Sequence, residues 1–167
     1  HSAAVAAVLL VHRLPAATPL PAGVSQRLGL SLDAEQRTSL RGHRCSDCGR
    51  DLLLQLPRDG ALQPGDWLLS DDSAIAVQVI AAPEPLLRVS AASPLELLQA
   101  AYHLGNRHVA LELHGDHLLL PRDPVLHDLL LHRGLTVAAL EAPFVPEAGA
   151  YGAAHAHAHA HDHQHHH

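Results

Sequence analysis

The sequence is poor in aromatic residues, methionine and cationic residues, and each shortage excludes a class of function. Trp and Phe occur once each, Tyr twice and Met never. The core must therefore be built mainly from Leu, Val, Ile and Ala, which argues against aromatic cages and base-stacking platforms. Lys and Arg together number 11 against 17 Asp and Glu, so there is no cationic excess to neutralise phosphates. Nucleic acid is therefore not expected as a partner.

Long apolar runs are also missing. The run near the start, residues 3–11, is nine residues long, whereas ~20 residues are needed to cross a bilayer. It lacks the cationic start and the cleavage pattern of a secretory signal. The two cysteines, Cys45 and Cys48, are three positions apart, a spacing that favours metal binding or redox chemistry over a structural disulfide. We therefore expect a cytoplasmic protein with no membrane partner.

Histidine is the residue that the sequence has in excess. The chain contains 17 histidines, and eight of them lie within the last thirteen residues. These eight are His155, His157, His159, His161, His163, His165, His166 and His167. From Pro146 onward the chain consists mostly of Gly, Ala and His without apolar periodicity, so residues 149–167 are expected to form a disordered tail. In an extended chain alternate residues share one face, which would align His155 through His165.

This His-rich tail predicts metal handling. Neutral imidazole is a good ligand for nickel, copper and zinc, and the affinity should fall as the pH drops through ~6.5 because binding displaces protons. We favour Ni²⁺ as a cargo ion, with Zn²⁺ and Cu²⁺ as the other candidates. The alternative is an expression tag or a passive low-complexity tract. The spacer residues argue against a tag for the whole tract, although His165, His166 and His167 alone would fit one.

Residues 1–82 predict a small all-β domain. Extended segments alternate there with turn-forming stretches such as Pro57-Arg58-Asp59-Gly60. The expected strands cover residues 3–13, 37–42, 50–56, 67–69 and 74–80. The run Ala81-Ala82-Pro83-Glu84-Pro85 then interrupts any continuation, because proline lacks a backbone donor and disfavours helix before it. We place the domain boundary in this run.

Residues 83–148 predict a ferredoxin-like βαββαβ domain, so the expected fold class is α+β. Strands are expected over residues 86–90, 109–113, 117–120 and 135–140. The first helix should begin after Ser93, a capping residue, and run to about Leu104, where Gly105-Asn106 stops it. The second helix should begin at Pro124 after the capping Asp123 and end at Gly134. The result would be an antiparallel sheet with both helices on one face.

The run His43-Arg44-Cys45-Ser46-Asp47-Cys48-Gly49 is a second candidate metal site. A Cys-x-x-Cys followed by glycine can present two thiolates from a tight turn, and His43 could add an imidazole. A closed zinc site needs a fourth ligand, and the chain has no second Cys-x-x-Cys. An equally weighted alternative is a solvent-exposed, reduced turn between strands. A thioredoxin-like role is disfavoured because the strand and helix that it needs do not follow.

The remaining histidines are isolated, and residue type alone favours surface or helix-end roles for them. This holds for His108, which follows Gly105-Asn106-Arg107. It holds equally for His103, His114, His117, His127 and His132. The sequence has no nucleophile–base pair, phosphate-binding glycine loop or His-Glu-x-x-His motif. We therefore expect a protein that is not an enzyme.

Four features of the sequence form a recognisable combination. They are Ala101-Tyr102-His103-Leu104-Gly105-Asn106-Arg107-His108-Val109, Gly134-Leu135-Thr136-Val137, Pro143-Phe144-Val145-Pro146-Glu147-Ala148-Gly149-Ala150-Tyr151 and the histidine tail. With these features the chain resembles the urease accessory protein E (UreE) family, the nickel metallochaperones of urease maturation. The resemblance covers essentially all of both expected domains, and the first and third motifs are specific.

The resemblance implies a homodimer formed through the ferredoxin-like domains, and an N-terminal β domain that engages protein or peptide partners. It also implies that His108 meets its twin across the two-fold axis, where the pair binds one nickel with help from tail histidines. The implied receivers are the urease accessory GTPase and the urease apoprotein. A nickel or zinc storage protein without a specific receiver is the first rival, and a metal-dependent hydrolase is the second.

The sequence departs from the family pattern at two places. Many members carry histidines just before the second helix, where this chain has Arg122-Asp123-Pro124. Ala110 stands where a proline is often found. The Cys-x-x-Cys is not part of the general family pattern, so the resemblance gives it no role.

Overall fold

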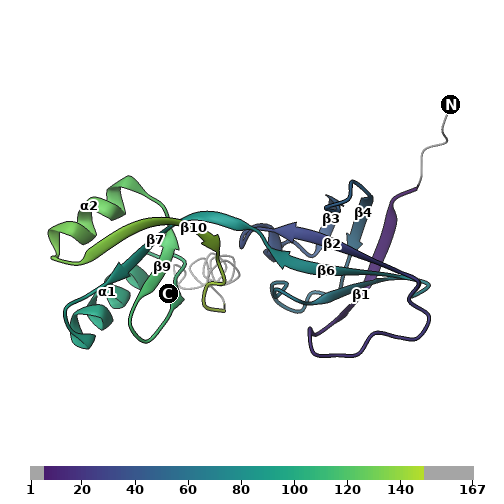
Figure 1. Ribbon diagram of the computed structural model, residues 1–167, viewed down its shortest axis with the longest axis horizontal. Helices are drawn as coiled ribbons and strands as arrows, with labels where there is room; N and C mark the ends of the chain where they lie inside the picture. Colours follow the sequence, from purple (N-terminus) through teal and green to yellow (C-terminus); the bar gives the residue numbers. More distant parts are fainter. Residues whose placement is uncertain (1–5, 149–167) are drawn as a thin grey trace, which may run out of the picture. The chain divides into compact units, whose positions relative to one another are not determined.

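The computed structural model describes residues 6–148 and divides the chain into two compact units, His1–Ala81 and Ala82–His167. The predicted tail, residues 149–167, lies outside the described residues. Each unit contains one sheet, and both α-helices belong to the second unit (Figure 1). The expected α+β class is therefore confirmed. The division falls one residue before the boundary expected after residue 82.

Unit 1 is built around a six-stranded sheet. Its strands are β1 (Val8–Leu14), β2 (Gln26–Leu32), β3 (Arg41–Cys45), β4 (Asp51–Gln55), β5 (Trp67–Ser70) and β6 (Ile75–Ala81). They lie in the order β2-β6-β5-β1-β4-β3, with β1–β4 and β2–β6 parallel and the other pairs antiparallel. Leu30 of β2 and Leu54 of β4, from opposite halves of the sheet, belong to one apolar core. The sheet is therefore curved around that core.

Two segments of unit 1 differ from the sequence prediction. Strand β2 was not expected, although its apolar residues alternate along the strand as a half-buried strand requires. Residues 37–42 were expected to be extended, but Gln36–Thr38 form a short 3₁₀ helix, η1. Two reciprocal hydrogen bonds lie at its start, because Asp33 Oδ1 accepts from the Gln36 backbone N–H at 2.7 Å and Gln36 Oε1 accepts from the Asp33 N–H at 2.9 Å.

Unit 2 contains four strands and two helices. They follow the chain order β7 (Pro83–Ser90), α1 (Pro94–Asn106), β8 (Glu112–Leu113), β9 (Leu118–Pro121), α2 (Pro124–His132) and β10 (Thr136–Pro143). The strand order in the sheet is β10-β7-β9-β8, and every neighbouring pair is antiparallel. None of the helices within residues 6–148 is long and apolar enough to span a bilayer.

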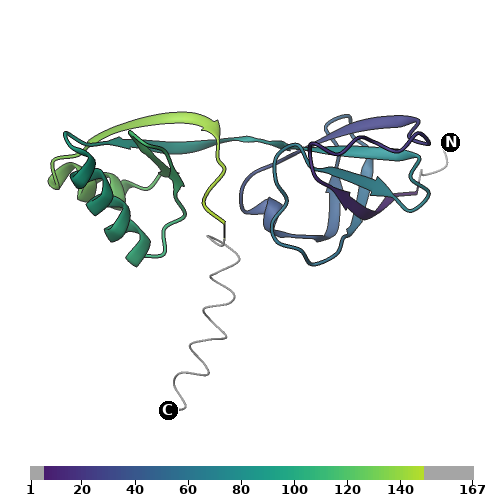
Figure 2. The ribbon, with the colours of Figure 1, turned by 90° about the horizontal axis from the view of Figure 1, so that it is seen from below.

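Both helices of unit 2 pack on the same face of the sheet (Figure 2). Leu87 and Val89 alternate along β7 and share one apolar core with Leu97 and Leu104 of α1 and Leu130 of α2. Side chains two positions apart in a strand point to the same face. This core holds the C-terminal end of each helix against the sheet.

The predicted helix starts are confirmed. Ser93 caps α1, its Oγ accepting from the Glu96 N–H at 3.2 Å. Asp123 caps α2, its Oδ1 accepting from the N–H groups of Val125 at 2.8 Å and Leu126 at 3.0 Å. A proline occupies the first position of each helix, where its missing N–H costs nothing.

The expected linker is already part of the sheet, because β7 begins at Pro83 rather than at residue 86. Pro85 accepts a hydrogen bond at its carbonyl from the Arg122 N–H, at 3.0 Å. In an antiparallel strand the N–H and C=O of one residue point to the same side. The ladder with β9 ends where Leu86 pairs with Pro121. The ring nitrogen of Pro85 therefore points toward the end of the β9 ladder and not toward β10, whose Glu141 pairs with Pro85.

Candidate metal-binding site

His108 lies directly beyond the end of α1, whose C-cap is Arg107. The N–H of His108 donates to Gly105 O at 3.0 Å, and the N–H of Val109 donates to Leu104 O at 3.1 Å. This pair of bonds is the Schellman ending, which requires a left-handed residue just after the C-cap. His108 supplies it with φ 60°, and the residue is exposed. The sequence predicted Gly105-Asn106 as the stop, but α1 continues through both residues.

The backbone conformation of His108 is costly for a side-chain-bearing residue. The left-handed region disfavours L residues by ~1–2 kcal/mol relative to right-handed helix, and glycine is the usual occupant. Ser73 is the other non-glycine residue with positive φ in the described part of the chain. Because strained residues concentrate at functional sites, the presence of an imidazole here points to a use for the side chain.

His108 does not belong to a complete ligand group within the described residues of its own chain. Among residues 6–148, no group of three or more His, Cys, Asp or Glu side chains could hold a metal ion. A protein metal site of nitrogen and sulfur ligands normally needs three or four donors. An ion bound at His108 would therefore draw at least one further ligand from a second copy of the chain or from residues outside the described range.

The segment that leads into the tail is fastened close to His108 along the chain. This segment, residues 144–147, is called the tail root below. Phe144 is fully buried. The Val145 N–H donates to Glu112 Oε1 at 2.7 Å, and the Glu147 N–H donates to Leu111 O at 2.7 Å. The tail root therefore lies beside the strand that follows His108 by only a few residues.

The β8–β9 hairpin carries two histidines that were not expected to form a pair. The rings of His114 and His117 are stacked, with centroids 4.3 Å apart and planes 7° from parallel. His114 Nε2 hydrogen-bonds to Glu112 Oε2, and His117 Nδ1 lies 2.6 Å from Asp116 Oδ1. Imidazole lone pairs lie in the ring plane, so two stacked rings cannot aim them at one ion. This hairpin is therefore a carboxylate–imidazole pairing rather than a metal site.

One carboxyl of this hairpin has a shifted pKa. The hydrogen bond from His117 lowers the pKa of Asp116 below its ordinary value, and burial opposes this shift. In unit 1, Asp72 also has a lowered pKa, chiefly because the Ser70 hydroxyl donates to its carboxylate, at 2.6 Å. Both carboxyls are at the surface, so these shifts describe local hydrogen bonding and not a reactive centre.

The other histidines that sequence reasoning treated as ordinary surface residues are spread over both helices. His103 meets Tyr102 edge-on, with ring centroids 5.5 Å apart. His127 and His132 belong to α2.

Arg122 stands just before α2, where many family members carry histidines. Its side chain donates to Leu140 O at 2.8 Å and so ties the start of α2 to β10.

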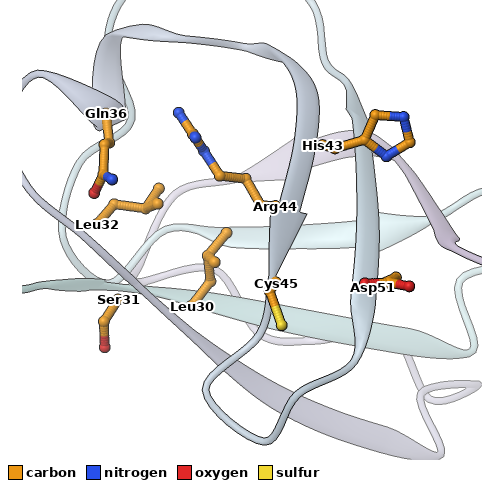
Figure 3. Close-up of a pocket in the computed structure, with 8 residues that line it drawn as sticks. All are labelled: Leu30, Ser31, Leu32, Gln36, His43, Arg44, Cys45 and Asp51. Atoms are coloured by element: carbon orange, nitrogen blue, oxygen red, sulfur yellow. The ribbon is translucent and has the colours of Figure 1, made fainter.

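The cysteine pair lies in the turn between β3 and β4. Cys45 ends β3 opposite Asp51, and both cysteines are exposed free thiols. Cys45 and His43 line one open pocket on unit 1, but the His43 ring points away from the Cys45 sulfur (Figure 3). The part of the chain that the structure describes therefore does not assemble His43, Cys45 and Cys48 into a three-ligand group.

Two elements of this site carried no sequence signal. The left-handed conformation of His108 was hidden because Gly105-Asn106 offered a more obvious stop, and α1 continues through both. The hydrogen bond from the Val145 N–H to the Glu112 carboxylate joins residues 33 positions apart. Spacing in the sequence cannot reveal such a contact. The tail histidines, His155 to His167, lie outside the described residues.

Comparisons with known proteins match the chain to one family of accessory proteins. Residues 84–167 match the family model described as UreE urease accessory protein, C-terminal domain. A urease accessory protein UreE from Synechococcus sp. (strain WH7805) is 67% identical over 129 residues, covering 77% of this chain and 74% of that protein. The UreE protein of Synechococcus sp. (strain CC9311) is 56% identical over 143 residues, covering 86% and 92%.

A relative from another genus gives the same result. The UreE protein of Thermosynechococcus vestitus is 53% identical over 135 residues, covering 81% of this chain and 94% of that protein. All three relatives are accessory proteins and none is urease itself. The chain belongs to the UreE family of urease accessory proteins.

Proposed function

We propose that this chain is a non-enzymatic nickel carrier that delivers Ni²⁺ during assembly of the urease active site. The observation that carries the proposal is His108, an exposed imidazole held in a left-handed conformation directly beyond α1. The specific site consists of His108 from two copies of the chain, completed by tail histidines. Nickel is cargo here, captured and released rather than retained.

The apolar face of α1 supports pairing of two copies through unit 2, a ferredoxin-like domain. Leu95, Leu98 and Tyr102 are 63%, 67% and 68% exposed. Their spacing of three and four residues places them on one side of the helix, opposite the core residues Leu97 and Leu104. A second copy packed on this stripe would cover apolar surface that water otherwise contacts. The stripe runs toward the end of α1 that carries His108, so a two-fold axis beside it brings the two imidazoles together.

The tail root supports the supply of further ligands from the tail. Glu147 is held beside Leu111, three residues after His108. His155 follows Glu147 by eight residues, a chain length of roughly 26 Å when fully extended. Tail histidines can therefore reach His108 of the same copy or of its partner. Two fixed imidazoles and exchangeable tail ligands leave the ion partly open, and this suits transfer better than a closed shell.

The receivers that we propose are the urease accessory GTPase and, through it, the urease apoprotein, in the cytoplasm. Zn²⁺ and Cu²⁺ compete for the same imidazoles, because nickel has no intrinsic advantage over them. Nickel selectivity must therefore come from supply and from the receiving protein. Neither nucleic acid nor a membrane takes part in the proposed transfer.

Nickel stoichiometry per dimer tests the shared site. Three proteins are compared by equilibrium dialysis: the full chain, a chain ending at Ala150, and that shorter chain with His108→Gly. Glycine is chosen because it adopts the left-handed conformation without strain, so the ligand is removed and the helix end is preserved. We expect truncation to remove most ions but leave one per dimer, and His108→Gly to remove that one. His132→Ala in the shorter chain is the matched control and should retain it.

The shared site is wrong if the shorter chain binds no nickel or if His108→Gly retains it. The dimer is tested separately with Leu98→Glu, which places a charge in the exposed stripe of α1. Light scattering should show a monomer that has lost the shared ion but keeps the tail ions. A Leu98→Glu protein that remains dimeric would place the interface elsewhere.

Storage is the second candidate function, because eight tail histidines exceed what one shared site requires. A carrier should bind the accessory GTPase more tightly when loaded with nickel, whereas a storage protein should be indifferent to it. Pull-down of the purified GTPase with apo and loaded chain distinguishes the two. Substrate turnover by the loaded chain would instead indicate a metal-dependent hydrolase.

A further inference from the structure

The turn that carries the two cysteines is closed by its own backbone. The Ser46 N–H donates to Arg50 O at 2.8 Å, and the Gly49 N–H donates to Ser46 O at 2.9 Å. Gly49 has φ 90°, a conformation that glycine adopts freely, so the turn is a tight hairpin with a left-handed residue. Cys45 therefore lies at the start of one short turn and Cys48 lies near its end.

The same turn is also fastened to a second strand. Asp47 Oδ1 accepts from the Ser31 N–H at 3.0 Å, Asp47 Oδ2 accepts from the Ser31 hydroxyl at 2.8 Å, and the Asp47 N–H donates to Gly29 O at 2.8 Å. A Cβ on Gly29 would lie 3.2 Å from Asp47 Oδ2 and 3.0 Å from Ile80 Cδ1, so glycine permits this close approach. The turn is therefore held in place from both sides without any disulfide.

Both thiols nevertheless remain accessible. Cys45 and Cys48 are exposed, and Cys48 Sγ lies 3.2 Å from the hydroxyl of the buried Ser46. The Ser46 hydroxyl already accepts from the Arg50 N–H at 2.9 Å. Its own proton is free to donate to the sulfur once the thiol is ionised.

We propose that Cys45 and Cys48 form a two-thiolate site for monovalent copper. Copper(I) is soft, selects thiolates and accepts two-coordinate binding, whereas zinc requires four ligands. The described residues offer two sulfurs and no third donor grouped with them. Binding releases the two thiol protons and leaves a bis-thiolate complex of charge −1. The copper enters and leaves as copper(I), so no electron is transferred.

This site is independent of the nickel carrier function. It belongs to unit 1, whereas His108 belongs to unit 2, and it binds a different ion through different donors. Copper(II) outcompetes nickel at imidazole. A thiolate site that captures copper in its reduced form would keep that competitor away from the histidines.

Copper(I) binding is measured on the reduced full chain under anaerobic conditions, in competition with the chromophoric chelator bathocuproine disulfonate. We expect the wild-type chain to hold one more equivalent than Cys45→Ser, Cys48→Ser or the double variant. The tail histidines are present in every protein, so their contribution cancels. Asp47→Asn should keep that equivalent but bind it roughly tenfold more weakly, because the turn loses its outer support. His43→Ala is the matched control and should bind like the wild type.

A second measurement needs no cysteine variant. One equivalent of copper(I) should protect both thiols of the wild-type chain from iodoacetamide, as read by mass spectrometry. The proposal is overturned if the double variant holds as much copper(I) as the wild type, or if the thiols alkylate equally fast with and without the ion. It is also overturned if the wild-type chain holds a zinc ion that the double variant lacks, in place of the extra copper(I) equivalent.

Discussion

The two helices of unit 2 end in the same way but with different residues. Each has an arginine at the C-cap, followed by a left-handed residue and an apolar residue whose N–H reaches back five positions. After α2 the left-handed residue is Gly134, with φ 80°, and after α1 it is His108, with φ 60°. The backbone requirement is identical, and glycine meets it at lower cost. The proposed nickel-binding role of the His108 side chain would account for this difference.

The largest expected effect comes from truncating the buried leucine at the C-terminal end of each helix. Leu104 and Leu130 are both 1% exposed, and each accepts the long backbone bond. Leu104→Ala and Leu130→Ala should each lower the free energy of unfolding by about 3 kcal/mol, as urea denaturation would show. Only Leu104→Ala should also weaken the nickel site of the chain that ends at Ala150. Equal losses of nickel in both variants would contradict the special role of the α1 ending.

The helix starts provide a smaller contrast. Asp123 accepts two backbone hydrogen bonds and Ser93 accepts one. Asp123→Ala should therefore cost about 1.5 kcal/mol and Ser93→Ala about 1 kcal/mol in thermal or urea unfolding. Asp123→Asn keeps an acceptor and serves as the control. If Ser93→Ala proved the more costly, the hydrogen-bond count would not explain the caps.

Exchanging the two left-handed residues sharpens the comparison most directly. Gly134→His should destabilise the protein by about 1 kcal/mol, and His108→Gly should stabilise it by about the same amount. The double exchange should unfold at nearly the wild-type urea concentration, yet in the chain ending at Ala150 it should bind no shared nickel. If His108→Gly is destabilising, contacts of the His108 side chain outweigh its backbone strain.

The smallest effect concerns the hairpin that follows His108. The hydrogen bond from His117 lowers the pKa of Asp116 in the folded chain below its ordinary value of 3.8. A depressed carboxyl contributes stability above the unfolded pKa, and this contribution is lost as the pH falls through the folded pKa. Asp116→Asn should therefore reduce the loss of stability between about pH 5 and about pH 3. Urea midpoints at both pH values measure it, and Asp128→Asn on α2 is the control.

The sequence predicted the second unit better than the first, for a local reason. The starts of α1 and α2 depend on contacts within a few residues, so Ser93, Pro94, Asp123 and Pro124 were sufficient to place them. Strand β2 was missed although its leucines alternate, and its pairing with β6, about 50 residues later in the chain, could not be read from the sequence at all. Sheet pairing depends on contacts that local pattern does not contain.

The candidate site could be predicted only in part. Residue type alone left His108 as an ordinary surface histidine, and the family resemblance supplied its role. The strain at His108 became visible only when φ was known. The tail root depends on the Glu112 carboxylate meeting Val145, which no spacing rule contains. The tail, by contrast, was evident from composition, and its role in binding nickel stays a prediction.

The tail root has a consequence for solubility. Strand β8 is the outer strand of its sheet and pairs on one side with β9. The pairing of His114 with His117 and of Glu112 with Leu119 directs the Leu111 carbonyl to the open side. The Glu147 N–H occupies that carbonyl, so the tail root covers part of an edge that could otherwise pair with a strand from another molecule. The segment that fastens the tail thereby also caps the sheet against aggregation.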